Sequence, residues 1–400
     1  MPRYMKKIPL YLQIFAGMGA GLVFGILLPN QVAWIAPLGT IFLKLLKMIV
    51  IPLIFVSIVD GITRMGNIQK LSSLGWKTIV YYLGTNVLAV FVSLILVNMI
   101  QPGEGVKAFG TSAADYATKG FSLEIIPSNI VASFAQGNSI QIIFVAILLG
   151  IALVVMFQKV PHIISLISEA HDILLSITGF LVRLAPIGVF GLMASMVSAL
   201  DWQVFVGIGK FAITILLGLI IHGCLILPLL FRMFSKRPLG DFFQKMRPAL
   251  LSAFSTSSSS ATLPITLNCV EKEVGVRKEI PGFVLPIGAT VNMDGTAMYE
   301  ATACLFIAQA VGIELSLMQQ LIVFFTASLA AVGAAAIPSA GLVTLTLVLS
   351  AVGLPLEGIG LLLAIDRPLD MSRTTVNVWG DMVGCAVIEG ISTSEPNKTD

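Results

Sequence analysis

The last long apolar stretch of the chain, residues 358–389, contains polar side chains that could bind ions or a charged substrate. They are Asp366, Asp370, Arg373, Thr374, Asn377 and Asp381. Successive members are four, three, one, three and four residues apart, so a helix would place them on one stripe. Apolar residues fill most positions between them, which argues against a solvated amphipathic helix. Because ionisable groups inside an apolar span are costly and usually functional, we expect this stripe to face a binding cavity.

The groups on the stripe suit an amino acid that carries an extra carboxylate. Arg373 offers a planar fork that can donate two hydrogen bonds to a carboxylate. Asp370, about one turn earlier, is an anion suited to an ammonium group. Asn377 and Asp381 offer the hard oxygen ligands that a small hard cation needs, and sodium is the natural candidate.

A second apolar stretch, residues 282–310, is broken in its middle by polar residues and a glycine. Asn292, Thr296 and Glu300 recur every four residues, which predicts that they share one helical face. Asp294 then points elsewhere or lies in an unwound turn. This pattern predicts two distinct ion or substrate contacts within one span.

Two further stretches are interrupted by small residues. Residues 255–262 are rich in serine and threonine, residues 331–341 are rich in glycine and alanine, and the apolar arms on either side are too short to cross a bilayer. A serine-rich loop outside the membrane, or small residues for close helix packing, would be the simpler explanation. We interpret both as helical hairpins that enter and leave on one side, because paired interrupted segments indicate an inverted-repeat transporter.

The composition places the whole chain in a membrane. Of its 400 residues 56% are hydrophobic and only 11% are charged, whereas soluble domains average about 25% charged. Stretches near the length needed to span a bilayer, about 20 residues, precede the segments described above. They are residues 8–28, 35–59, 78–100, 139–157, 163–200 and 204–230.

The distribution of basic residues predicts the orientation, because Lys and Arg collect in short cytoplasmic loops. The segments assigned to the inside contain Arg3, Lys6 and Lys7; Arg64, Lys70 and Lys77; Lys159; and Arg232, Lys236, Arg237, Lys245 and Arg247. This pattern fits six spans with the N-terminus inside. We expect a multi-pass protein of the cell (inner) membrane with both termini in the cytoplasm. The net charge of +3 is not clustered into a basic face, so no nucleic-acid partner is expected.

Cysteine and histidine give no sign of a metal site. None of them shows the paired spacing of metal ligands. They are Cys224, Cys269, Cys304, Cys385, His162, His171 and His222. We expect buried small thiols and no resident cofactor, with sodium only as a co-transported ion.

Three segments together resemble a known family. They are residues 257–264, with four consecutive serines followed by Ala-Thr-Leu-Pro; residues 292–296, Asn-Met-Asp-Gly-Thr; and residues 370–381, Asp-Met-Ser-Arg-Thr-Thr-Val-Asn-Val-Trp-Gly-Asp. They are similar to the dicarboxylate/amino acid:cation symporters, which include glutamate and neutral amino acid carriers of animals and archaeal aspartate transporters. The likeness extends over almost the whole chain.

The resemblance implies an all-α integral membrane protein with eight transmembrane helices, two re-entrant helical hairpins and inverted repeats. It also implies a homotrimer and an elevator motion, in which a transport domain slides along a scaffold. The implied division is residues 1–77 (scaffold helices one and two), 78–122 (transport-domain helix three and a loop), 123–200 (scaffold helices four and five), 201–390 (the rest of the transport domain) and 391–400 (a cytoplasmic tail).

The resemblance also implies a substrate site for an acidic amino acid. Its members are Ser258 and Ser259 for the α-carboxylate, Thr296 and Arg373 for the side-chain carboxylate, Asp370, Asn377 and the backbone near Ile337 for the amino end, and Thr374 beside them.

Three sodium sites follow from the same resemblance. They are Gly288, Asn292, Asn377 and Asp381; then Thr290 and Met293 with the carbonyls of Ala331, Val332 and Ala334; then Tyr82, Thr85, Asn86 and Asp294. Asn86 stands where relatives often have Ser or Thr.

Glu300 resembles the glutamate that animal carriers use for a cotransported proton, where archaeal sodium-only relatives have Gln. A permanently protonated Glu300 that only donates a hydrogen bond is the alternative. Some relatives place an arginine at the positions of Ser257 or Met371, whereas here Arg367 follows Asp366, as in bacterial members.

Other functions fit less well. A proton-coupled C4-dicarboxylate carrier of the same fold would tend to have Ser at Asp370 and Asn at Asp381, and a neutral amino acid carrier would lack Arg373. An anion channel would conduct without substrate stoichiometry. An intramembrane hydrolase would need a base near the serine run, and no histidine lies there, so the sequence predicts a transporter and not an enzyme.

Overall fold

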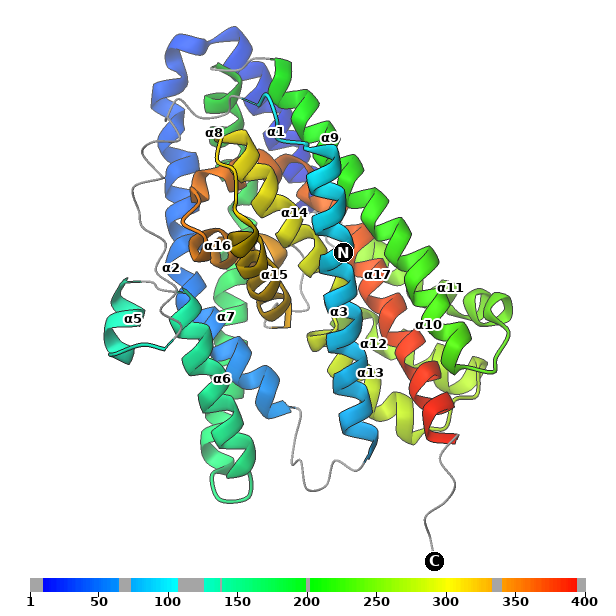
Figure 1. The fold of residues 1–400 in the computed structure, drawn as a ribbon. Helices are drawn as coiled ribbons and strands as arrows, with labels where there is room; N and C mark the ends of the chain where they lie inside the picture. Colours follow the sequence, from blue (N-terminus) through cyan, green and yellow to red (C-terminus); the bar gives the residue numbers. More distant parts are fainter. Residues whose placement is uncertain are drawn as a thin grey trace, which may run out of the picture.

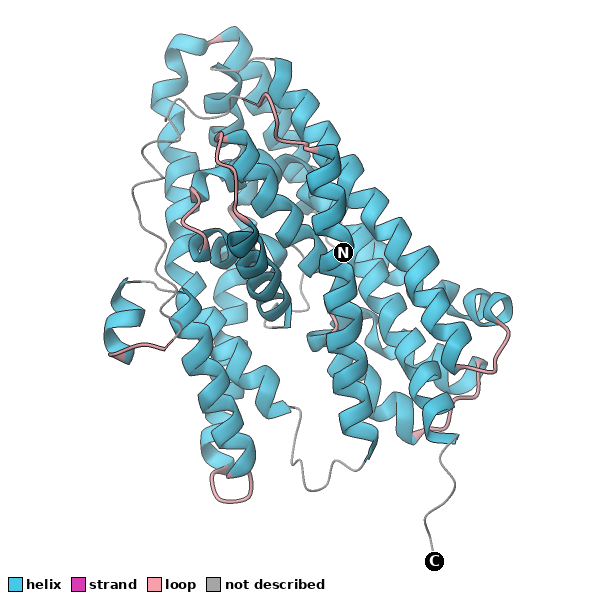
Figure 2. Ribbon diagram, viewed as in Figure 1, coloured by secondary structure: helices cyan, strands magenta, loops and turns pink. Residues whose placement is uncertain are grey.

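The computed structural model describes residues 10–64, 73–106, 126–136, 139–198, 202–332 and 340–393. These residues form helices joined by short loops, with no strand among them (Figure 2). The α-helices of the first half are α1 (Leu10–Leu27), α2 (Val32–Arg64), α3 (Ser73–Ile100), α5 (Ile130–Gln136), α6 (Ser139–Val155), α7 (Pro161–Arg183) and α8 (Ala185–Ser198). Those of the second half are α9 (Trp202–Ile221), α10 (Leu227–Phe234), α11 (Leu239–Thr256), α12 (Ser259–Asn268), α13 (Glu279–Val291), α14 (Asp294–Ala310), α15 (Leu317–Val332), α16 (Ala340–Ala351) and α17 (Ile359–Thr393).

Several of these helices are apolar and long enough to cross a membrane. Among the described residues, Leu74–Ile100, Pro161–Leu181 and Gln203–Phe234 have the length and composition of a span. Ala16–Leu27 and Pro29–Phe42 would form a fourth if the 109° bend between them lies inside one span. The all-helical fold that the resemblance implies is confirmed for the described residues, and the apolar helices are consistent with the membrane location expected from composition. The number of eight spans stays a prediction.

The helices pack in two groups (Figure 1). The first group contains α1, α2, α6, α7 and α8, and glycines bring its helices close together. A side chain at Gly188 of α8 would collide with the ring of Phe42 on α2, and one at Gly17 of α1 would collide with the backbone of Pro186. The group is therefore closely packed.

The second group is built around α14 and α17, against which α3, α9 and the helices from α11 to α16 are arranged. Figure 1 shows α3, α9 and α17 side by side. Every residue of α14 is buried except Gln309, as expected for a helix enclosed on all sides. The centre of this group is where polar side chains would be shielded from both lipid and water.

The break predicted within residues 282–310 is present, but it changes one expectation. Helix α13 ends at Val291, Asn292 and Met293 leave the helical conformation, and α14 begins at Asp294. Thr296 and Glu300 lie four residues apart on α14 as predicted. The prediction that Asn292 shares their face is wrong, because the helical period restarts after the break.

The serine-rich segment forms the predicted helix, break and second helix. Ser257 between α11 and α12 has a left-handed backbone with φ of 52°, and Ser258 caps α12 by accepting a hydrogen bond from the amide of Ala261 at 3.2 Å. Helices α11 and α12 pack against each other, as do α15 and α16. The predicted tip of the second hairpin, including Ala334 and Ile337, lies outside the described residues.

Candidate functional site

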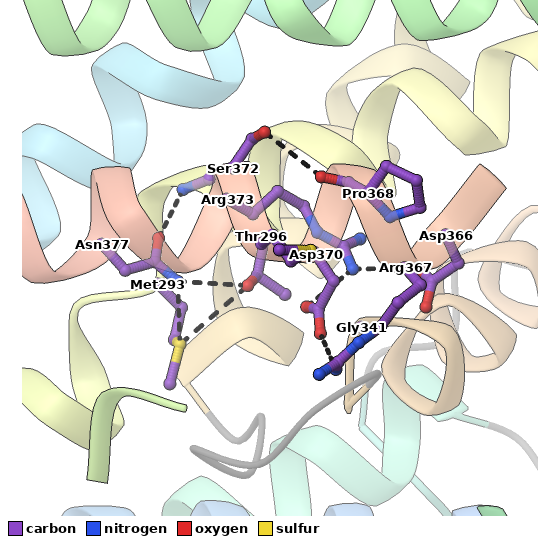
Figure 3. Close-up of polar contacts among 12 residues, drawn as sticks. Met293, Thr296, Gly341, Asp366, Arg367, Pro368, Asp370, Ser372, Arg373 and Asn377 are labelled. Atoms are coloured by element: carbon purple, nitrogen blue, oxygen red, sulfur yellow. Dashed lines mark hydrogen bonds and ion pairs between the residues drawn. The ribbon is translucent and has the colours of Figure 1, made fainter. Parts of the chain in front are cut away.

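Arg373 lies at the centre of a charged cluster on α17 (Figure 3). Its side chain is fully buried, and its Nη2 lies 2.9 Å from Oδ1 of Asp366 and 2.9 Å from Oδ1 of Asp370. The guanidinium also stacks over the ring of Tyr299, 3.8 Å from its centroid. Its Nε and Nη1 have no hydrogen-bond partner among the described residues. Within the described part of the chain, two donors of this buried cation are therefore unsatisfied, which is costly unless another group accepts from them.

Asp370 has a second basic neighbour. Its Oδ2 lies 3.5 Å from Nη1 of Arg367, so both of its oxygens face guanidinium groups. Sequence reasoning assigned Asp370 to the ammonium group of a substrate but did not foresee this contact. We refer to Asp366, Arg367, Asp370 and Arg373 as the arginine cluster.

Helices α14 and α16 close around the arginine cluster through glycines. A side chain at Gly341, near the start of α16, would lie 3.2 Å from Nη1 of Arg373 and 3.3 Å from Cγ2 of Thr296. One at Gly295 of α14 would lie 2.9 Å from the backbone of Arg373. The unpartnered edge of Arg373 therefore lies near Gly341 of α16.

Asn377 connects the arginine cluster to the break between α13 and α14. Its Oδ1 accepts a hydrogen bond from the amide of Gly295 at 2.8 Å. Its Nδ2 lies 3.4 Å from Oγ1 of Thr296 and 3.3 Å from Sδ of Met293. Thr374 is buried beside Arg373. The structure thus brings together most of the substrate residues predicted on α14 and α17.

The predicted serine residues lie at the start of α12, which packs against α17. Ser258 and Ser259 are buried, and the backbone carbonyl of Ser258 accepts a hydrogen bond from Thr262 at 2.9 Å. Their assignment to a substrate α-carboxylate stays a prediction.

A second cluster forms where the break meets α3 and α17, and we call Thr85, Asn292, Asp294 and Asp381 the break cluster. Nδ2 of Asn292 donates to Oδ1 of Asp381 at 2.9 Å. Oγ1 of Thr85 lies 3.3 Å from Oδ1 of Asn292 and 3.3 Å from Oδ1 of Asp294. All four side chains are buried, so two carboxylates lie within a few ångströms of amide and hydroxyl oxygens, away from water.

The break cluster contains members of two predicted sodium sites. A side chain at Gly288 would collide with the Tyr82 hydroxyl and the Asp381 carboxylate, so this glycine permits their close approach. The Tyr82 hydroxyl donates to the carbonyl of Val284 at 2.9 Å. Both side-chain polar atoms of Asn86 are buried, and neither has a hydrogen-bond partner in the described part of the chain. Because an unpartnered buried amide is costly, a polar ligand beside Asn86 would be stabilising.

The other predicted sodium site is only partly described. The Thr290 hydroxyl donates to the carbonyl of Ile287 within α13 at 3.0 Å. Met293 contacts Asn377, Ala331 is buried near the end of α15, and Val332 is the last residue of α15. Ala334, the remaining member of this predicted set, lies outside the described residues.

His222 is a member of the buried site that sequence reasoning missed. Its Nε2 lies 2.9 Å from Oδ2 of Asp294, and both side chains are fully buried. His222 begins a π-helical turn, His222–Ile226, and the indole of Trp379 donates to the freed carbonyl of Gly223 at 3.0 Å. The two residues are 72 positions apart, so no spacing rule could pair them. The only available signal was a lone histidine in an apolar stretch.

Glu300 links α14 to α16. It is fully buried, its Oε1 accepts a hydrogen bond from the Thr344 hydroxyl, and its Oε2 has no partner among the described residues. Glu300 therefore contacts α16, the second arm of the second predicted hairpin, directly.

These features define a helical membrane protein with two buried polar clusters. In the arginine cluster, Arg373 contacts the carboxylates of Asp366 and Asp370. In the break cluster, Asp294 and Asp381 have hydroxyl and amide neighbours. Residues 10–391 match the model of the sodium:dicarboxylate symporter family, and the chain belongs to this family.

The chain is similar over most of its length to relatives whose names mention different substrates. The chain is 33% identical to "Excitatory amino acid transporter 3" of Mus musculus, over all of this chain and 88% of that protein. It is 31% identical to "Proton/sodium-glutamate symport protein" of Bacillus caldotenax, over 98% of each chain. It is 34% identical to "C4-dicarboxylate transport protein" of Rhizobium etli, over 95% of this chain and 88% of that protein. Identity alone therefore does not choose the substrate.

Proposed function

We propose that the protein is a secondary active symporter of acidic amino acids, L-glutamate or L-aspartate, coupled to sodium ions. The observation that carries the proposal is the buried Arg373, two of whose nitrogens have no partner in the described part of the chain, with Asp370 beside it. Together they suit a ligand with carboxylates and one ammonium group. The names of the relatives from Mus musculus and Bacillus caldotenax support acidic amino acids as the substrate class.

Sodium fits the break cluster as the co-transported ion. Asp294 and Asp381 are buried carboxylates, and burial of an anion is strongly unfavourable unless a cation or hydrogen bonds compensate. Thr85 and Asn292, which contact these carboxylates, carry oxygens of the type that hard cations prefer.

Coupling between ion and substrate would pass through Asn377. Its backbone oxygen accepts a hydrogen bond from Asn292 at 3.3 Å, while its side chain contacts Thr296 near Arg373. An ion that fixes Asn292 therefore also positions Asn377 for the substrate. Such a shared element gives each ligand a higher affinity when the other is bound.

The division of this chain into a scaffold and a transport domain is part of the same proposal. The first helix group would form the scaffold from residues 1–77 and 123–200, and the second would form the transport domain from residues 78–122 and 201–390. Among the described residues the helices of the first group contact one another more than they contact the second group, although α16 and α17 also touch α2 and α8, and this pattern supports the division. We propose eight spans, two re-entrant hairpins, a homotrimer, an elevator motion, and an inner-membrane location with both termini in the cytoplasm.

Uptake by purified protein in liposomes tests the proposal. Sodium, proton and potassium gradients are imposed one at a time, and accumulation of aspartate and glutamate should require the inward sodium gradient. Uptake at full rate without sodium would contradict it, and conduction of anions without substrate accumulation would indicate a channel.

A C4-dicarboxylate carrier is the second candidate. The name of the Rhizobium etli relative favours it, and so does the contact of Arg367 with Asp370, which leaves the anion of Asp370 neutralised. Succinate that displaces aspartate as well as glutamate does would favour this candidate.

A further inference from the structure

The Asp370 carboxylate is contacted by two guanidinium groups of unequal strength. Arg373 donates a hydrogen bond to Oδ1 at 2.9 Å, whereas Arg367 lies 3.5 Å from Oδ2, beyond ordinary hydrogen-bond length (Figure 3). Nε of Arg367 is buried and has no hydrogen-bond partner among the residues that the structure describes. Arg367 therefore neutralises Asp370 without being locked to it.

The formal charges of the arginine cluster sum to zero, because two arginines balance Asp366 and Asp370. Without Arg367 the sum would be −1. The four side chains are mostly shielded from water, with exposures of 3%, 15%, 8% and 1% in chain order, so this difference is only weakly screened.

The two candidate substrates make opposite demands on Asp370. An acidic amino acid brings an ammonium group, which must compete with Arg367 for Oδ2. A C4-dicarboxylate brings no ammonium group, and a bare Asp370 carboxylate would repel it. The contact between Arg367 and Asp370 thus weakens binding of an acidic amino acid and permits binding of a C4-dicarboxylate.

We propose that Arg367 is a positioning residue that sets substrate specificity, acting through Asp370 by competing with the substrate's ammonium group for Oδ2. The inference rests on the proposed function of the site as one for acidic amino acids. When aspartate binds, its ammonium group replaces Arg367 on Oδ2. When succinate binds, Arg367 stays on Asp370 and keeps the cluster neutral.

The test is equilibrium binding to the purified full-length protein in saturating sodium, with aspartate titrated directly and succinate measured by competition. In Arg367→Gln, aspartate should bind more tightly and succinate more weakly. The ratio of the two dissociation constants should shift by about tenfold or more, equivalent to about 1.4 kcal/mol. Arg367→Lys keeps the charge and should stay within about threefold of the wild-type ratio.

Two controls separate this role from a general structural one. Arg277→Gln removes an exposed arginine and should leave the ratio unchanged. In an Asp370→Asn background, the further change Arg367→Gln should have little effect, because the carboxylate through which Arg367 acts is gone.

An unchanged ratio in Arg367→Gln, or an equal shift in the Asp370→Asn background, would overturn the inference while leaving the proposed function intact. Failure of both Arg367→Gln and Arg367→Lys to fold would also overturn it, since Arg367 would then be structural. A wild-type protein that binds succinate but not aspartate would overturn the proposed function and the inference together.

Discussion

The arginine cluster and the break cluster are both buried and polar, but they are built in opposite ways. The carboxylates that contact Arg373 precede it by seven and three residues on the same helix, α17. In the break cluster, Thr85 contacts Asp294 across 209 residues and Asn292 contacts Asp381 across 89. The first forms with one helix, whereas the second exists only when α3, the α13–α14 break and α17 are packed together.

This difference assigns separate physical tasks to the two clusters. The arginine cluster is a local, internally neutralised group that can discriminate ligand charge. The break cluster contains two buried carboxylates, Asp294 and Asp381, which we propose bind sodium, so ion binding should stabilise the packing of the second helix group. Substrate recognition and ion binding should therefore be separable by mutation.

The largest expected effect comes from Arg373→Cys. This change leaves Asp366 and Asp370 without their shared cation, a loss of about 3–5 kcal/mol for a buried pair, and it should abolish aspartate and glutamate uptake. Sodium should still raise the thermal stability of the variant, because the break cluster is intact. Uptake of neutral serine or alanine by the variant would sharpen the distinction, and retained aspartate uptake would contradict it.

Asp381→Asn should have the opposite effect, because it should weaken the response to sodium while leaving the arginine cluster intact. Loss of one buried carboxylate should raise the sodium concentration needed for half-maximal aspartate binding by about tenfold or more, equivalent to about 1.4 kcal/mol. The asparagine oxygen can still accept the hydrogen bond from Asn292, so the fold should persist. Sodium titrations of aspartate binding give the measurement, and an unchanged sodium requirement would remove Asp381 from the ion site.

Glu300→Gln tests whether proton coupling depends on a residue outside both clusters. If Glu300 transfers the coupled proton, an inward proton gradient should speed wild-type uptake in sodium-loaded liposomes but not uptake by the variant. The Gln oxygen can still accept the hydrogen bond from Thr344, so sodium-dependent substrate binding should be unchanged. An identical response to pH in both proteins would show that Glu300 is only a hydrogen-bonded structural residue.

The smallest effect is expected for Thr85→Val. It removes one neutral hydroxyl shared by Asn292 and Asp294, a loss of about 1 kcal/mol or roughly fivefold in sodium affinity. Thr78→Val is the matched control, because Thr78 is a buried threonine of the same helix whose hydroxyl, among the described residues, bonds only to the carbonyl of Leu74 at 2.8 Å. Equal effects of the two substitutions would mean that Thr85 supports α3 rather than the ion site.

Sequence patterns predicted the arginine cluster better than the break cluster for a physical reason. Helical periodicity is visible when partners lie three to seven residues apart, as Asp366, Asp370 and Arg373 do. Contacts that close only after packing, such as His222 with Asp294, leave no trace in local spacing. Asn292 was assigned to the helical face of Thr296 and Glu300 because periodicity was carried through a break, whereas Asn292 lies between α13 and α14 and belongs to neither helix.

The most direct test of the account is the dependence of aspartate affinity on sodium, measured by calorimetry at constant ionic strength with choline as the replacement cation. The account predicts that the dissociation constant falls steeply as sodium rises, and that Asp381→Asn flattens this dependence while Arg373→Cys removes aspartate binding. An aspartate affinity that does not change with sodium would contradict the central claim that the two clusters bind coupled ligands.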